Sequence, residues 1–368
     1  MNTIAFPDAL SDVSAGNSKV PQSEFLPSGD LAVVDQGRAL IAGYTNDHRA
    51  AVRSPLPLIV FGDHTRAIKY IDFPFAMGAD GVKVLQVREG LDPKFVYHYL
   101  RARQIPSAGY SRHFKFLKRL ELPVPPLPDQ KRIAAILDRG DTIRAKRRDT
   151  LTNLDTLAQS VFQDMFGSPS NWGERWDTGT IGSLARSVDY GSSAKAGEAG
   201  EWPILRMGNL TDSGRIDLTD LKYLNLTPSE VPKHTARRGD LLFNRTNSKE
   251  KVGKAAVVRT DTPLALAGYL VRVRFDNAAT AEFVSAFLRS PYGRAVRLRV
   301  AKAAVNQANI SASEMRKIPI ALPPAHEIDL FAKRLAAIES ARVGVSRTIA
   351  ADAALFASLQ SRAFRGDL

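Results

Sequence analysis

An internal repeat constrains the fold of this chain more than any other feature of its sequence. The segment that begins at Leu122 recurs near the C-terminus, and Pro125-Pro126 matches Pro323-Pro324 at an offset of 198 residues. The same offset, without a gap, relates Asp129 to Glu327, Ala134 to Ala332, Leu137 to Leu335, Arg144 to Arg342, Leu157 to Leu355, Ser160 to Ser358 and Phe166 to Phe364. Loops tolerate insertions, whereas a helix that keeps its packing register does not. The repeat therefore predicts one long helix in each copy.

The spacing within the repeat indicates that the two helices pack on each other. Apolar residues recur at alternating steps of three and four, which is typical of a packed helix face. A helix from about Asp129 to Phe166 would be roughly 55 Å long. Gly140 lowers helix stability by about 1 kcal/mol and marks a candidate break, although Ile338 at the matching position favours a continuous helix. The expected pairing residues are Leu137, Leu151, Leu154 and Val161 in the first copy and Leu335, Ile349, Phe356 and Leu359 in the second.

Any two amphipathic helices look partly alike, but one offset that holds from the proline pair to the final phenylalanine argues against coincidence. The chain of 368 residues also exceeds what one hydrophobic core usually serves. We therefore expect an α+β protein with four regions: a first globular domain over residues 1–121, a first long helix region over 122–168, a second globular domain over 169–318 and a second long helix region over 319–368.

The two globular regions resemble each other weakly. Apolar runs bounded by turn residues predict strands over residues 57–63 and 81–87 in the first, and over 239–244, 252–258 and 270–275 in the second. A short amphipathic helix follows in each: residues 93–101 match residues 281–289 at an offset of 188. Each half of the chain is therefore expected to be a mixed α/β globule attached to a long helix.

The charge of the chain favours a polyanionic partner, and double-stranded DNA in particular. Fifty-one basic residues against 38 acidic ones give a formal net charge of +13. Many soluble proteins are basic without binding nucleic acid, but here the charge is clustered. No acidic residue lies between Glu282 and Glu314, or between Asp92 and Glu121, while these intervals contain five and seven bases, respectively.

The candidate DNA contacts combine side chains that bond base edges with side chains that hold phosphates. The densest set is Asn244-Arg245-Thr246-Asn247 with Lys249 and Lys251, and a solvated hairpin rich in turn formers is an equally good interpretation of any one of these residues. A lone histidine after a strand, such as His64, is more often a hydrogen-bonded loop residue. The remaining candidates are Gln36, His64, Arg66, Lys69 and Arg112 in the first globule and Arg206 and Asn209 in the second.

The sequence lacks the motifs of a DNA-modifying or DNA-cleaving enzyme. There is no cysteine, and hence no disulfide, thiolate nucleophile or cysteine metal site. The proline pairs are followed by Leu127 and Ala325 and not by the aromatic residue of an adenine methyltransferase site, and no Walker A sequence occurs. Asp129 and Lys131 superficially suggest a nuclease site, but a helix N-terminus is the better interpretation. We expect no catalytic residue, no metal site and no cofactor in this chain.

No stretch approaches the roughly 18 uncharged residues of a membrane span. We therefore expect a cytoplasmic protein without membrane contact.

Together these features resemble the specificity subunits of type I restriction-modification enzymes, over nearly the whole chain. The most specific similarities are the entry to the first helix (residues 122–138), its exit (159–167) and the C-terminal segment 355–368. Segments 33–37, 61–65 and 239–245 are similar to signatures of target-recognition domains. Segment 325–329 departs from the family pattern, since Ile328 stands where the first copy has Gln130.

The resemblance implies two target-recognition domains that each read half of a bipartite DNA sequence, separated by long helices that pair antiparallel. It also implies two methyltransferase subunits and a restriction/translocase subunit as partners, with S-adenosylmethionine, ATP and magnesium bound by those partners. Two alternatives remain open: a self-sufficient restriction or modification enzyme with an unrecognised catalytic motif, and a coiled-coil scaffold that binds DNA without sequence specificity.

Overall fold

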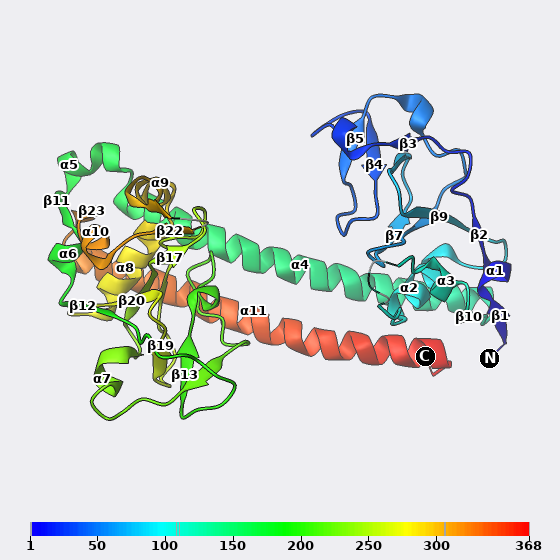
Figure 1. The fold of residues 1–368 in the computed structure, drawn as a ribbon. Coiled ribbons are helices and arrows are strands. Elements are labelled where there is room, and N and C mark those ends of the chain that lie inside the picture. The colour runs from blue at the N-terminus through cyan, green and yellow to red at the C-terminus, as the bar shows by residue number, and fades with distance from the viewer. Residues whose placement is uncertain (1, 108, 110, 305–306, 368) are drawn as a thin grey trace. The chain divides into compact units, whose positions relative to one another are not determined.

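The chain forms two compact units in a computed structural model that describes residues 2–107, 109, 111–304 and 307–367 (Figure 1). Unit 1 comprises Met1–Arg148 and Arg347–Leu368, and unit 2 comprises Asp149–Ser346. Each unit thus takes part of both repeat helices, α4 (Leu127–Phe166) and α11 (Ala325–Arg365), together with one globule. The expected α+β class is confirmed.

Unit 1 contains two four-stranded sheets and a short antiparallel pair. The first sheet is antiparallel and has the order β2 (Leu10–Asp12), β9 (Val82–Val87), β6 (Leu58–Gly62) and β7 (Ile68–Ile71). The second is mixed and has the order β3 (Lys19–Val20), β8 (Phe75–Gly78), β4 (Leu31–Val34) and β5 (Gly43–Thr45). Strands β1 (Thr3–Ala5) and β10 (Glu121–Pro123) form the pair, and the helices are α1 (Phe6–Ala9), α2 (Pro93–Ala102) and α3 (Phe114–Leu117).

Unit 2 is larger, and its described residues form four sheets. An antiparallel sheet has the order β12 (Ser187–Tyr190), β20 (Leu270–Arg274), β16 (Leu241–Asn244) and β18 (Ala255–Val257). A mixed sheet has the order β14 (Lys222–Leu224), β13 (Trp202–Leu205), β19 (Leu264–Leu266) and β15 (Thr235–Ala236). The smaller sheets are β17 (Thr246–Asn247), β22 (Gln307–Asn309) and β21 (Lys302–Ala304), and β11 (Asp177–Thr180) with β23 (Pro319–Leu322). The helices are α5 (Trp172–Arg175), α6 (Ile181–Leu184), α7 (Val231–His234), α8 (Ala278–Arg289), α9 (Pro291–Val300) and α10 (Ala312–Arg316).

The two short amphipathic helices predicted from the sequence are α2 and α8, and both begin at side-chain caps. The carboxylate of Asp92 accepts the backbone N–H of Phe95, and the amide oxygen of Asn277 accepts that of Thr280. Such caps satisfy backbone donors that the first turn leaves unpaired. Both helices bury an apolar face in the core of their own unit, with Phe95 in unit 1 at the position of Phe283 in unit 2.

The repeat helices pair antiparallel within each unit. In unit 1, Arg147 of α4 forms an ion pair with Asp352 and donates to the carbonyl oxygen of Thr348, 3.3 Å away. In unit 2, the ring of Phe166 lies 5.5 Å from that of Phe331, at the opposite end of α11. Residue numbers therefore rise along α4 as they fall along α11. The candidate break at Gly140 does not occur, because α4 is continuous, as Ile338 at the matching position suggested.

The predicted pairing residues differ in burial. Three of them, Leu137, Leu335 and Phe356, are buried in the cores of their units. Leu154 and Val161 pack against the unit 2 core and Leu359 against the unit 1 core, while Leu151 and Ile349 are half-buried. The four region boundaries and the pairing roles of these eight residues stay predictions, since burial alone does not identify the partner of each side chain.

Candidate nucleic-acid interface

The densest candidate set in unit 2 lies where β16 leaves its sheet. Asn244, the last residue of β16, is fully buried, and its side-chain Nδ2 donates to the carbonyl oxygen of Met207 at 3.3 Å. Its backbone bonds Lys254 and Gly253 across the adjoining turn. In this conformation the side chain is inaccessible to a ligand at the surface. Asn244 instead fixes the loop that follows through these hydrogen bonds.

The next three residues form the half-buried surface of that loop. The guanidinium of Arg245 stacks on the ring of Tyr190, 4.9 Å from the centroid, and its backbone N–H donates to the carbonyl oxygen of Tyr269. Thr246 and Asn247 form β17, which pairs with β22. The stacked Arg245 is thereby fixed beside two exposed tyrosines, an arrangement in which a cation and aromatic faces can contact nucleotides.

Lys249 and Lys251 follow on the exposed turn after β17, while Arg206 and Asn209 lie beside a depression of about 880 Å³. Arg206 donates through Nη2 to the carboxylate of Asp220 at 2.8 Å. The buried side chain of Asn209 accepts the backbone N–H of Arg206 and donates to two carbonyl oxygens, so it organises the loop. The depression is lined chiefly by Ser192, Lys195, Arg206, Asn209, Asp220 and Tyr269.

In unit 1, Gln36, His64 and Arg66 come together at the turn between β6 and β7. The side-chain oxygen of Gln36 accepts the backbone N–H of His64 at 3.3 Å, and its carbonyl oxygen accepts the Thr65 hydroxyl. Arg66 is exposed and has a φ of 64°, a left-handed conformation that is uncommon outside glycine. Its Nη1 donates to the carbonyl oxygen of Ile105 at 3.0 Å.

The other two unit 1 candidates are not equivalent. Lys69 is buried, and its ammonium group donates to the carbonyl oxygen of Asp35 at 2.7 Å. Burial lowers the pKa of Lys69, while Asp35 opposes this shift. Arg112 is exposed. A depression of about 830 Å³ adjoins the turn and is lined by Thr65, Arg66, Ile68, Arg101, Arg103 and Gln104, among others.

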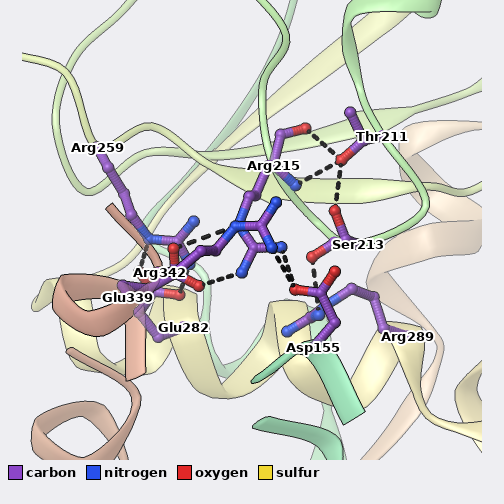
Figure 2. Close-up of polar contacts among 9 residues, drawn as sticks. All are labelled: Asp155, Thr211, Ser213, Arg215, Arg259, Glu282, Arg289, Glu339 and Arg342. Carbon is purple, nitrogen blue, oxygen red and sulfur yellow. Dashed lines mark hydrogen bonds and ion pairs between the residues drawn. The ribbon is translucent and has the colours of Figure 1, made fainter. Parts of the chain in front are cut away.

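The unit 2 loop that carries Asn209 is anchored to both long helices by Arg215 (Figure 2). Its Nη1 lies 2.6 Å from Asp155 of α4, and its Nη2 lies 2.5 Å from Glu339 of α11. Arg342 of α11 shares Asp155 at 3.1 Å. The backbone N–H of Arg215 donates to the Thr211 hydroxyl, which closes the loop onto itself. Charged hydrogen bonds to two partly buried carboxylates thus fix this loop on the helix pair.

A second arginine supports the same loop from α8. Arg289 donates to the carbonyl oxygen of Ser213 at 2.9 Å (Figure 2), and a Cβ at Gly214 would lie 2.6 Å from the Cδ of Arg289. Burial, then the nearby Arg259 and Arg215, lower the pKa of Arg289 to about 10. Arg259 is itself paired with Glu282 at 2.5 Å. Gly214 has a φ of +72°, so glycine both permits the turn and leaves room for Arg289.

Unit 1 attaches its short helix to α4 by a comparable set of charges. His98 of α2 is fully buried, with Nε2 at 2.7 Å from Asp138, which also pairs with Lys94. Arg101 pairs with Asp141 one turn further along. Burial lowers the pKa of His98 and outweighs the opposite effect of Asp138. Charged hydrogen bonds thus hold the globule of unit 1 to its own part of α4.

Several residues that shape these surfaces were not found from the sequence. Tyr190 and Tyr269 flank Arg245, and Asp63 accepts the backbone N–H of Phe114 at 2.7 Å and so supports the turn that presents His64. A search for basic and amide side chains could not single them out, because their roles depend on contacts across the sheets. Within the described residues, no group of three or more His, Cys, Asp or Glu could hold a metal ion, and no helix there has the length and apolarity to cross a membrane.

Comparison with known proteins finds relatives of one kind. Residues 21–153 match the model of the type I restriction modification DNA specificity domain. The chain is 28% identical over 272 residues to the type I restriction enzyme EcoKI specificity subunit of Escherichia coli (strain K12), which covers 68% of this chain. The chain is thus similar to the specificity subunits of type I restriction-modification enzymes. The resemblance found in the sequence is confirmed.

Other relatives extend the match. A putative type I restriction enzyme MjaX specificity subunit of Methanocaldococcus jannaschii is 28% identical over 166 residues, or 44% of this chain. The matches span 58% of the EcoKI subunit and 39% of the MjaX subunit. Among solved structures, the S subunit of a type I restriction-modification system from M. genitalium has a TM-score of 0.60 at 14% identity, with 99% of this chain and 96% of that one covered. A chain from a structural study of type I complex assembly has a TM-score of 0.55 at 16% identity, with 100% and 98% covered. This chain shares the fold of these two structures.

Proposed function

We propose that this specificity subunit is a non-catalytic DNA-recognition protein that reads a bipartite target, one half-site with each globule. The observation that carries the proposal is the duplication of one arrangement. In each unit, a buried strand (β6 or β16) leads into a polar turn whose residues are exposed or half-buried. A short helix (α2 or α8) packs in the same core as that strand. Two readers attached to two continuous helices suit a target with two separated halves.

The residues proposed to touch DNA are those whose side chains remain accessible. In unit 2 these are Arg245, Thr246 and Asn247 for the bases and Lys249 and Lys251 for the phosphates. The corresponding set in unit 1 is Gln36, His64, Arg66 and Arg112. The buried candidates Lys69 in unit 1 and Asn209 and Asn244 in unit 2 instead bond backbone carbonyl groups of neighbouring loops.

The proposed protein partners are two methyltransferase subunits and one restriction/translocase subunit. S-adenosylmethionine, ATP and magnesium would be bound by those partners. Two exposed leucines support docking of the same partner twice: Leu157 is 46% exposed and Leu355 is 60% exposed, and the repeat offset of 198 relates them. In unit 1, Leu355 borders a groove of about 210 Å³ that also includes Ile136 and Ile143. Contiguous exposed apolar patches are typical of interaction sites, and in unit 1 the exposed Ile143 and Leu355 border the same groove.

The first experiment is to co-purify the chain with the methyltransferase encoded beside it and to select bound duplexes from a random-sequence pool. Two short fixed blocks at a constant gap are expected. A single block, or no enrichment, would contradict the bipartite proposal and favour a scaffold. Replacing Arg245 and Asn247 by alanine should relax one block and leave the other unchanged, whereas equal loss at both would show that these residues are not local readers.

Docking is tested by counting bound methyltransferase copies by mass photometry. Leu157→Asp and Leu355→Asp should each remove one copy, and the double variant should remove both. Leu218→Asp is the matched control, because Leu218 is 44% exposed but lies outside both long helices. Two copies retained by the double variant would exclude these leucines as docking points.

A further inference from the structure

Gly140 and Phe356 form a tight large–small contact between the long helices in unit 1. A Cβ added at Gly140 would lie 2.7 Å from Cδ2 and 2.9 Å from Cε2 of the Phe356 ring. Phe356 is buried in the core of unit 1, and the guanidinium of Arg144 covers its ring at 4.6 Å. Because Gly140 has no side chain, it leaves a space on the surface of α4 that the ring of Phe356 from α11 fills.

Unit 2 has a second large–small contact, in which the two repeat positions have exchanged sizes: the position that is small in unit 1 is large in unit 2, and the other way round. The offset of 198 relates Gly140 to Ile338 and relates Ala158 to Phe356. Asp155 faces Arg342 in unit 2, so the antiparallel register brings Ala158, three residues further along α4, opposite Ile338, four residues earlier on α11. Both side chains are buried in the same hydrophobic cluster. The large residue comes from α11 in both units, but it occupies a different position of the repeat in each.

This reversal distinguishes pairing within one chain from pairing between two copies. If α4 paired with α4 of a second copy in the same register, Gly140 would face Ala158, and a void would remain on each side. If α11 paired with α11, Ile338 would face Phe356, and the seam would be overpacked. Voids and overpacking both destabilise a packed seam, and helix pairs use such differences to select their partner.

We propose that the reversed pairs Gly140–Phe356 and Ala158–Ile338 are a specificity device that directs each long helix to the other repeat and away from the same repeat in a second copy. The duplicated helices otherwise carry matching apolar positions, such as Leu137 and Leu335. A seam with that symmetry would favour exchange between copies. The proposal concerns the assembly of the chain itself and does not depend on what the globules bind.

The test is to make the two ends of the seam equivalent in the full chain. In the double variant Gly140→Ile/Phe356→Ala, both ends combine isoleucine with alanine, so pairing between like repeats no longer creates voids or clashes. Two copies with different affinity tags are unfolded together, refolded and pulled down through one tag. The wild type should give background amounts of mixed dimer, and the double variant about tenfold more or higher, since each relieved mismatch shifts the equilibrium by about that factor.

Leu137→Ala is the control, because it opens a cavity in the same unit 1 core but leaves the large–small difference of both pairs unchanged. It should lower the melting temperature and leave mixed dimers at background. Gly140→Val/Phe356→Ala is a second version in case the first double variant does not fold; like-repeat pairing would again set a large residue against a small one, so mixed dimers should again rise above background. Equal mixing by the wild type and a folded double variant, or mixing by Leu137→Ala at the level of the double variant, would overturn the proposal.

Discussion

Replacing Arg215 by methionine should destabilise unit 2 strongly, although Arg215 is not in a hydrophobic core. Its side chain is 17% exposed and bonds two carboxylates that belong to different helices. Methionine retains the apolar length of the side chain but leaves Glu339, which is 18% exposed, without its closest cation. Asp155 keeps Arg342 as a partner. A net hydrogen bond to a charged group contributes about 1.5–3 kcal/mol, so we expect a loss of about 2–3 kcal/mol.

The tryptophan content of the chain makes this measurable for one unit alone. The three tryptophans are Trp172, Trp176 and Trp202, and all of them belong to unit 2. Tryptophan fluorescence during urea unfolding therefore reports on that unit. With an m-value of about 2 kcal/mol per molar urea, the expected loss moves the midpoint by about 1 M.

Arg238→Met provides the matched control, because Arg238 forms an ion pair of similar geometry with Asp261, yet both side chains are largely exposed. Exposed pairs contribute little to stability, so its midpoint should hardly move. A second readout follows from the anchored loop: Arg215→Met should weaken selection of the half-site that we propose unit 2 reads, and of that half-site only. Equal midpoints for the two variants would refute the view that Arg215 anchors the loop to the helices.

Three further outcomes are expected. Burial lowers the pKa of His98, so the unfolded chain takes up this proton more readily, and the stability of unit 1 should fall as the pH drops below the ordinary histidine value of about 6.5. His98→Gln should flatten this pH dependence of the urea midpoint between about pH 7 and pH 5, measured by circular dichroism because the tryptophans report on unit 2. Gly214→Ala should cost about 1–2 kcal/mol in the same fluorescence assay, because alanine is strained at a φ of +72° and meets Arg289. Replacing Lys249 and Lys251 by alanine should reduce the salt dependence of DNA affinity by about one phosphate contact each without altering the selected sequence, and a changed sequence would contradict their assignment to the backbone.

Much of the fold was predictable because it repeats. The helix predicted from about Asp129 to Phe166 extends over Leu127–Phe166, and the predicted strands and short helices appear as β6, β9, β16, β18, β20, α2 and α8. Gly140 was the ambiguous position, since local propensity allowed a break. The phenylalanine that stabilises the helix there lies 216 positions away in sequence, at Phe356, and only the tertiary structure brings it close.

The candidate site was less predictable, because residue type does not reveal which way a side chain turns. Asn244 and Asn209 have the amide chemistry of base readers, yet both are buried and bond backbone carbonyl groups. Lys69 shares the buried face of β7 with Ile71, although its place between Ile68 and Tyr70 would suggest an outward-facing lysine. The sequence pattern therefore gave no signal that separates the buried Lys69 from the exposed Arg66.

The two units also show how a duplicated attachment can be kept while its chemistry changes. The offsets of 188 and 198 relate Arg101 to Arg289 and Asp141 to Glu339. In unit 1, Arg101 pairs directly with Asp141. In unit 2, the corresponding carboxylate, that of Glu339, pairs with Arg215 from the loop. Arg289 donates instead to the carbonyl oxygen of Ser213 in the same loop. The position that fixes the short helix to the long helix in unit 1 thus fixes a surface loop in unit 2. A change in that loop should therefore alter both the proposed reading surface and the stability of unit 2, whereas the turn at Arg66 in unit 1 can vary without disturbing the contact between α2 and α4.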